Sequence, residues 1–120
     1  MKPLIRTDGK RPVIGDTVPI QITVSNVPAD TMIVKAWVTF KRKLSDPDAN
    51  AVIQKTITSG FTGTTTVSFT ITLTASDTAL FQPDREYFFD VQVKDSSGGI
   101  YTPLPDGVVI WQKGVTDAQT

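Results

Sequence analysis

A strictly alternating segment near the C-terminal end of the chain constrains the fold more than any other feature. Apolar side chains here alternate with a mostly polar set: the first are Tyr87, Phe89, Val91 and Val93, and the second are Phe88, Asp90, Gln92 and Lys94. A period of two is that of a β-strand that buries one face. The Ser-Ser-Gly-Gly at residues 96–99 tolerates positive φ, which predicts a hairpin with a return strand from Ile100. The segment therefore predicts a central core strand paired with its successor.

A corner motif precedes this strand. Phe81, Pro83 and Tyr87 are spaced as in the corner before strand F of fibronectin type III and immunoglobulin-like domains, which the motif resembles. In those domains the tyrosine ring enters the core, and its hydroxyl bonds to the backbone of the preceding loop. We predict that Tyr87 is this structural corner residue; the alternative is a core tyrosine without a special corner. Arg85 and Phe81 depart from the pattern, which usually has Thr or Ser and Leu there.

Other segments alternate in the same way and are separated by turn residues. They lie within residues 17–25, 32–43, 51–59, 64–74 and 108–113, and residues 3–7 predict a short edge strand. Pro19 cannot donate to a ladder, which predicts a sheet edge, and residues 74–77 predict one helical turn. We predict an all-β, immunoglobulin-like or fibronectin-III-like Greek-key sandwich of about seven strands. Residues 1–113 would form this single domain, followed by a polar tail at residues 114–120.

The alternation also predicts which side chains point inward. In the long strand candidate, the inward set would be Val34, Ala36, Val38 and Phe40. Trp37 would then lie on the outer face among lysine stems, unless a bulge shifts the register. In the last strand, we expect Val108 and Ile110 to point inward, and Val109 and Trp111 to point outward.

Three outward aromatic residues follow from this assignment. Trp37, Phe88 and Trp111 would lie on strands C, F and G, which are neighbours in one sheet of an immunoglobulin-like sandwich. Exposed aromatic residues are typical of interface centres, so these three predict an interaction surface. The alternative is that lysine stems and the C-terminal tail cover the rings. A second uncharged surface is the Ser/Thr row at residues 68–74, which is either solvated or covered by a partner.

One loop has a partial metal-binding pattern. Asp46, Asp48 and Asn50 match the D-x-D-x-N opening of a calcium loop, in which alternate oxygens converge on a hard cation. Ala51 and Ile57 stand where such a loop needs Gly and Glu. We therefore expect a polar turn closed by side-chain hydrogen bonds, and no metal or other cofactor.

The composition argues against several functions. The chain has no Cys and no His, so it lacks thiolate ligands and the commonest general base. Asp46, Asp48, Asp84 and Asp90 are the acidic candidates, and no spacing pairs them for acid and base catalysis. Twelve basic residues balance twelve acidic ones without a stripe, so we expect no nucleic-acid partner. The first residues lack a signal-peptide core, and no run is long enough to span a membrane. We expect a non-enzymatic protein made in the cytoplasm.

A second resemblance covers most of the chain. The ordered segments IVKAWVTFK (33–41), SDPDANAVIQK (45–55), YFFDVQVK (87–94) and GIYTP (99–103) resemble small immunoglobulin-like proteins encoded among tail and baseplate genes of tailed bacteriophages, including the N-terminal domain of baseplate upper proteins. Trp111 has no known counterpart there. The resemblance implies a phage or prophage virion structural protein, made in the bacterial host cytoplasm. Because the sequence begins with Met and shows no tag, we expect a small complete reading frame. It would act by assembly with other virion proteins or with itself.

The alternative function is a carbohydrate-binding or cell-surface-binding module. An exposed Trp37 or Trp111 could stack on a sugar ring, with Asp90 as the nearest polar partner.

Overall fold

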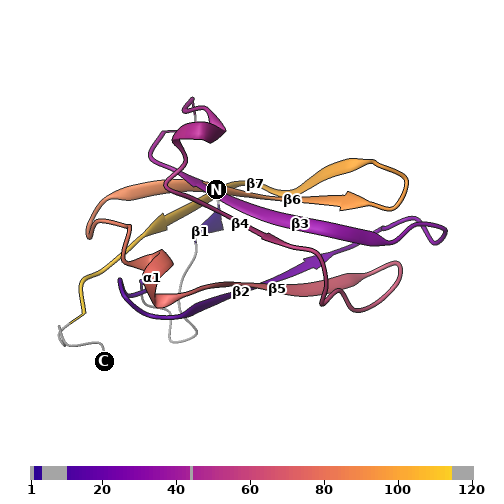
Figure 1. The fold of residues 1–120 in the computed structure, drawn as a ribbon, viewed down its shortest axis with the longest axis horizontal. Helices are drawn as coiled ribbons and strands as arrows, with labels where there is room; N and C mark the ends of the chain where they lie inside the picture. The colour runs from indigo at the N-terminus through magenta and orange to yellow at the C-terminus, as the bar shows by residue number, and fades with distance from the viewer. Residues whose placement is uncertain (1, 4–10, 44, 115–120) are drawn as a thin grey trace.

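The computed structural model describes residues 2–3, 11–43 and 45–114, and it shows a β-sandwich (Figure 1). The strands of the described residues are β1 (Lys2–Pro3), β2 (Val18–Val24), β3 (Ile33–Lys41), β4 (Ile53–Ile57), β5 (Val67–Leu73), β6 (Glu86–Asp95) and β7 (Ile100–Ile110). The helical elements are a 3₁₀ turn at Asp48–Asn50 and the short helix α1 (Ala75–Thr78). The prediction of an all-β sandwich is confirmed.

The strands form two sheets of unequal width. The wide sheet has the order β1-β7-β6-β3-β4, and the narrow sheet pairs β2 with β5. All the pairs are antiparallel except β1 with β7, which is parallel. With β3, β6 and β7 as strands C, F and G, and β2 and β5 as B and E, this is the immunoglobulin-like arrangement.

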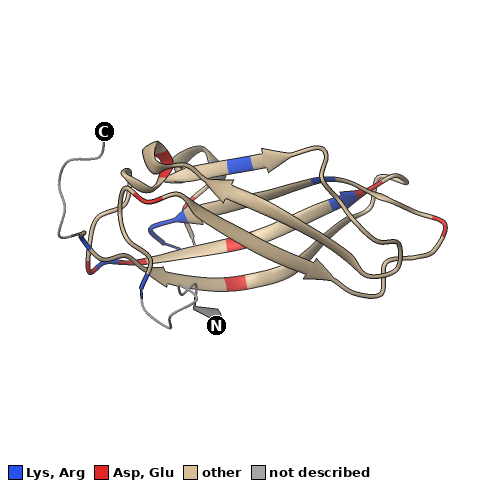
Figure 2. Ribbon diagram, turned by 90° about the horizontal axis from the view of Figure 1, so that it is seen from below, with Lys and Arg blue, Asp and Glu red and all other residues tan. Residues whose placement is uncertain are grey.

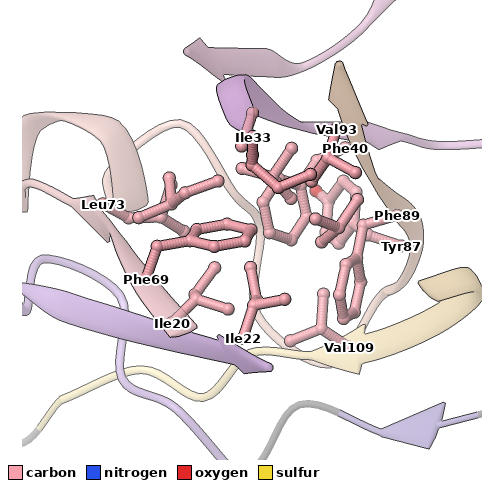
Figure 3. Packing of buried hydrophobic residues seen from close by; sticks show 14 of the residues in the cluster. Ile20, Ile22, Ile33, Phe40, Phe69, Leu73, Tyr87, Phe89, Val93 and Val109 are labelled. Atoms are coloured by element: carbon pink, nitrogen blue, oxygen red, sulfur yellow. The ribbon is translucent and has the colours of Figure 1, made fainter. Parts of the chain in front are cut away.

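The core lies between the two sheets. Alternate residues of the narrow sheet point into it, including Ile20, Ile22, Phe69 and Leu73 (Figure 3). Their outward neighbours on β5 are exposed, as the Ser/Thr row predicts. Each fully buried aliphatic or aromatic side chain contributes roughly 1.5–3 kcal/mol, so a two-stranded layer holds through its packing against the wide sheet rather than through its ladder alone.

The tyrosine corner is present. The Tyr87 hydroxyl accepts a hydrogen bond of 2.8 Å from the backbone N–H of Gln82, and the Tyr87 ring is fully buried. Its ring meets that of Phe81 edge-on, with 4.9 Å between centroids. Pro83 forms a parallel bridge with Trp111. The prediction for Phe81, Pro83 and Tyr87 is therefore confirmed, and we call this end of the sandwich the corner end.

The predicted orientation of the last strand is wrong. Val109 and Trp111 are buried, at 1% and 0% exposure, whereas Val108 and Ile110 are only half-buried. Gly107 supplies one physical reason, since it lies opposite Phe89 and a Cβ at this position would collide with the Phe89 ring. The inward position opposite Phe89 thus requires a glycine, which places the alternate positions 109 and 111 inward as well.

The burial of Trp111 also has a packing reason. Its ring stacks on Phe81 with 4.5 Å between centroids and an interplanar angle of 15°. Phe40 packs edge-on against the same Phe81 ring at 5.2 Å. The space beside the Phe81 ring is filled by an indole but not by a valine or an isoleucine, because interiors are close-packed.

The long strand β3 contains a bulge, and one predicted orientation in it is wrong. Ala36, Val38 and Phe40 are buried as expected, but Val34 is exposed and Ile33 is buried in its place. The register between β3 and β6 shifts between residues 33 and 35, so one extra residue reverses the alternation before Lys35. Trp37 lies after the bulge and remains on the outer face.

The helical turn is confirmed as α1 and carries a complete capping box. The Thr74 hydroxyl accepts from the N–H of Asp77, and the Asp77 carboxylate accepts from the N–H of Thr74 at 2.8 Å. Lys55 of β4 pairs with the same carboxylate at 2.9 Å. Burial alone would raise the pKa of Asp77, but the bonds from Lys55 and Thr74 lower it below its ordinary value. This ion pair connects the edge strand of the wide sheet to the end of the narrow one.

Two predictions fall on undescribed parts of the chain. Of the edge strand predicted at residues 3–7, only Pro3 is described, at the end of β1. Residues 115–120 of the predicted polar tail lie outside the described residues.

Candidate functional site

The outer face of the wide sheet does not carry the predicted patch of three aromatic residues. Trp111 lies in the core, which leaves Trp37 and Phe88 on this face. Trp37 is opposite Gln92, whereas Phe88 is opposite Lys41, so the two rings are four residues apart along the paired strands. That separation is about 13 Å at the rise of a β-strand. The two aromatic residues are therefore not in one contiguous cluster.

Both remaining aromatic residues are half-buried by neighbouring side chains. The Nζ atom of Lys35 lies 5.5 Å from the centroid of the Trp37 ring, within cation–π range. Phe88 is paired with Val108 of β7. The predicted alternative to an open aromatic surface was that lysine side chains cover the rings. The contact of Lys35 with Trp37 agrees with that alternative.

Exposed apolar side chains gather instead at the end of the sandwich opposite the corner. We call this the hairpin end; it comprises residues 25–34 and residues 95–103. Met32 is 70% exposed, Ile100 58% and Tyr101 48%, and Val34 is also exposed. The sequence contains a signal for this exposure, because Met32 and Ile100 immediately follow turn residues. The signal does not decide the matter, because both residues fit equally well at the buried end of a strand.

A groove of about 500 Å³ opens beside these residues. It lies between the end of β2 with its following loop and the first part of β7. Its apolar lining includes Val24, Val27, Pro28, Ile33 and Pro103. None of the residues that line the groove is charged, so the groove fits an apolar, uncharged group.

The β6–β7 hairpin is held by the buried carboxylate of Asp95. Its Oδ1 accepts from the Ser97 hydroxyl (2.8 Å), the Ser97 N–H (3.0 Å) and the Gly99 N–H (2.8 Å). Its Oδ2 accepts from the Tyr101 hydroxyl at 3.0 Å. These bonds, with that of the Ser97 hydroxyl foremost, lower the pKa of Asp95, and the same carboxylate raises the pKa of Tyr101. The carboxylate thus shapes the turn and fixes Tyr101 at the groove.

Two backbone contacts join the loops of the hairpin end. Ser96 donates its N–H to the Met32 carbonyl at 2.7 Å, and its hydroxyl accepts from the Met32 N–H at 3.1 Å. Val27 donates its N–H to the Thr65 carbonyl at 2.9 Å. The groove wall is therefore built from loops that support one another.

Charge and metal-ligating groups do not define a second site. Charged residues are scattered over the described ribbon without a continuous stripe of one sign (Figure 2). Within residues 2–3, 11–43 and 45–114, no three acidic side chains lie close enough together to hold a metal ion. The Asp46, Asp48 and Asn50 loop contains a 3₁₀ turn in which Asn50 donates its N–H to the Pro47 carbonyl.

Comparisons with known proteins add no family. No protein-family model matches the chain, and no curated protein matches it. In the part of the chain that the structure describes, no helix is long and apolar enough to cross a membrane.

Proposed function

We propose that this chain is a non-enzymatic structural protein of a phage or prophage virion, in the tail, the baseplate or the head surface, and that it acts by binding other virion proteins or itself. The observation that carries the binding role is the hairpin end, where exposed apolar side chains border an uncharged groove. Such surfaces are typical of protein contacts rather than of reaction centres.

The virion assignment rests on the sequence resemblance to small tail and baseplate proteins. The immunoglobulin-like sandwich is compatible with that resemblance, and it supplies a stiff body on which loops can be presented. A binding role also fits the absence of His and Cys from the whole sequence, because the common nucleophile, base and metal chemistries use these residues. A virion protein would be made in the bacterial host cytoplasm.

Mass spectrometry of purified particles tests the virion assignment. Phage particles from a bacterial strain that carries this reading frame would be purified on a density gradient, and their peptides would be compared with those of the cell lysate. The proposal expects peptides of this chain to be enriched in the particle fraction together with tail proteins. Their presence in the lysate and absence from the particles would overturn it.

The carbohydrate-binding alternative receives less support from the geometry. Stacking on a sugar needs an open aromatic face, but Lys35 lies over the Trp37 ring and Trp111 is fully buried. Asp90, the expected polar partner, lies opposite Thr39 rather than beside an exposed ring. Binding of the purified protein to a glycan array, with loss of binding in Trp37→Ala, would favour this alternative.

A further inference from the structure

Within the described ranges, the edge of β2 that faces away from β5 has backbone groups without a hydrogen-bond partner at the hairpin end. Thr62 and Ser68 exchange both of their backbone hydrogen bonds, so the N–H and the carbonyl of Ser68 point away from β2. Ser68 is opposite Thr23 in the β2–β5 ladder. In an antiparallel pair these two form a non-hydrogen-bonded pair, and the backbone groups of Thr23 therefore point away from β5.

The same alternation applies along the rest of β2. The backbone N–H and carbonyl of Gln21 also point away from β5, in the plane of the sheet. The carbonyl of Pro19 points the same way, and proline has no N–H. Among the residues that the structure describes, none hydrogen-bonds to the backbone of Gln21 or Thr23. This half of β2 therefore has two donors and two acceptors in the spacing that a further strand would match.

The chain itself closes the space between β2 and β7 at the corner end. There the buried Pro12 accepts from the N–H of Gln112, and Ile14 donates to the Gln112 carbonyl. Gly15 donates to the Thr78 hydroxyl at 3.0 Å. At the hairpin end the corresponding space is the groove between Val24 and Pro103. One half of this boundary between the sheets is thus sealed by a segment of the chain, and no segment that the structure describes covers the other half.

The two edges that border the groove differ in their capacity to pair. Pro103 and Pro105 of β7 lack N–H groups, and prolines protect sheet edges from pairing. The Gln21–Thr23 part of β2 has no proline, no charge and no bulge in its ladder with β5. An incoming strand would therefore pair with β2.

We propose that an extended segment of a partner polypeptide adds to the edge of β2 at Gln21 and Thr23 as a third strand of the narrow sheet. Its inward side chains, at alternate positions, would be aliphatic and would fill the groove beside Val24 and Ile33. Main-chain hydrogen bonds supply the affinity in such strand addition, and pockets for alternate side chains supply the specificity. Among the described residues the wide sheet has five strands and the narrow sheet two, so a third strand in the narrow sheet would not make it wider than the sheet that it faces. This inference rests on the proposed binding role and names the partner's chemistry.

A selection from a random ten-residue peptide library by mRNA display provides the probe. The inference expects enriched peptides that have aliphatic residues at alternate positions and no charge between them. One enriched peptide would then be synthesised, and its binding to the full chain would be measured by calorimetry. Hydrogen exchange should show that the amides of Gln21 and Thr23 exchange rapidly in the free protein and that the peptide slows them.

Two proline substitutions make a matched pair. Thr23→Pro removes an outward N–H from the β2 edge and should weaken peptide binding at least tenfold. Thr72→Pro removes an outward N–H from the other edge of the same sheet and should leave binding unchanged. Both variants should fold, since Pro19 already occupies an equivalent outward position opposite Thr72.

Three outcomes of the peptide experiments would overturn the inference. They are the absence of enriched alternating peptides, equal binding by wild type and Thr23→Pro, and peptide binding without added protection at Gln21 and Thr23. If these two amides are already slow without peptide and the solution mass is doubled, a second copy occupies the edge, and the partner-segment inference fails. The particle composition is measured separately, so failure at the β2 edge and failure of the virion assignment are distinguishable.

Discussion

The two ends of the sandwich are closed in different ways. At the corner end, Phe81, Tyr87 and Trp111 fill the space between the sheets, and the segment around Pro12 covers its side. At the hairpin end, polar bonds to Asp95 hold the turn, while apolar side chains face solvent beside an open groove. The comparison suggests that one end stabilises the fold and that the other is available for binding. Five predictions test this division, from the largest expected effect to the smallest.

The two tryptophans should contribute very differently to stability. Trp111→Ala removes a fully buried ring that stacks on Phe81, and it should lower the free energy of unfolding by about 3–5 kcal/mol. Trp37→Ala, on the outer face, should cost less than about 1 kcal/mol. Urea denaturation followed by circular dichroism measures both changes. Equal costs would contradict the placement of Trp111 in the core.

Gly107 should not tolerate a side chain. A Cβ at this position would collide with the Phe89 ring, so Gly107→Ala should destabilise the protein by roughly 1–3 kcal/mol. Combining it with Phe89→Leu should cost less than the sum of the two single changes, because the smaller side chain makes room. Additive costs in urea denaturation would show that the two residues do not meet.

The same substitution at each end should separate a buried bond from a more exposed one. Tyr87→Phe removes the acceptor of the Gln82 N–H and should cost about 1 kcal/mol. Tyr101→Phe removes a donor to Asp95 from a residue that is 48% exposed, and its cost should be smaller. Thermal unfolding of the two variants gives the comparison. A larger cost for Tyr101→Phe would reverse the roles of the two ends.

Acid should weaken the hairpin through Asp95. Its pKa lies below the ordinary value of 3.8 in the folded state, so the folded state favours the charged carboxylate. The resulting stability is fully present above the pKa of the unfolded chain, about 3.9, and is lost as the pH falls through the lower folded value. The urea midpoint of wild type should therefore decline below about pH 4. Asp95→Asn should be less stable at pH 7 and show a shallower acid decline, whereas an unchanged slope would rule out Asp95 as a contributor.

Removal of an exposed apolar side chain at the hairpin end should leave the fold unaffected. Ile100 is 58% exposed, and Ile100→Thr should change the free energy of unfolding by less than about 0.5 kcal/mol. Val109→Thr serves as the comparison, because Val109 lies on the same strand but is buried in the core. Placing a hydroxyl there should lower the free energy of unfolding clearly more. A large loss of stability in Ile100→Thr would mean that this end supports the fold.

The sequence by itself determined most of the strands, the corner and the helical turn. Each depends on neighbours along the chain: the alternation of residues 87–94, the spacing from Phe81 to Tyr87, and the reach from Thr74 to Asp77. The outward position of Trp37 could also be predicted, since the run from Ala36 to Phe40 keeps its alternation. These features are local, so a single segment contains the information that specifies them.

Only the tertiary structure decided which face of β7 is buried and where the apolar surface lies. In isolation, residues 108–111 alternate equally well in either phase, and the choice depends on Phe89 above Gly107 and on Phe81 beneath Trp111. The bulge at Val34 likewise depends on pairing with β6. The groove joins residues about 75 positions apart, such as Val27 and Thr102. Packing between distant segments selects among local patterns of nearly equal energy, and for that reason the candidate site could not be located before the two sheets were assembled.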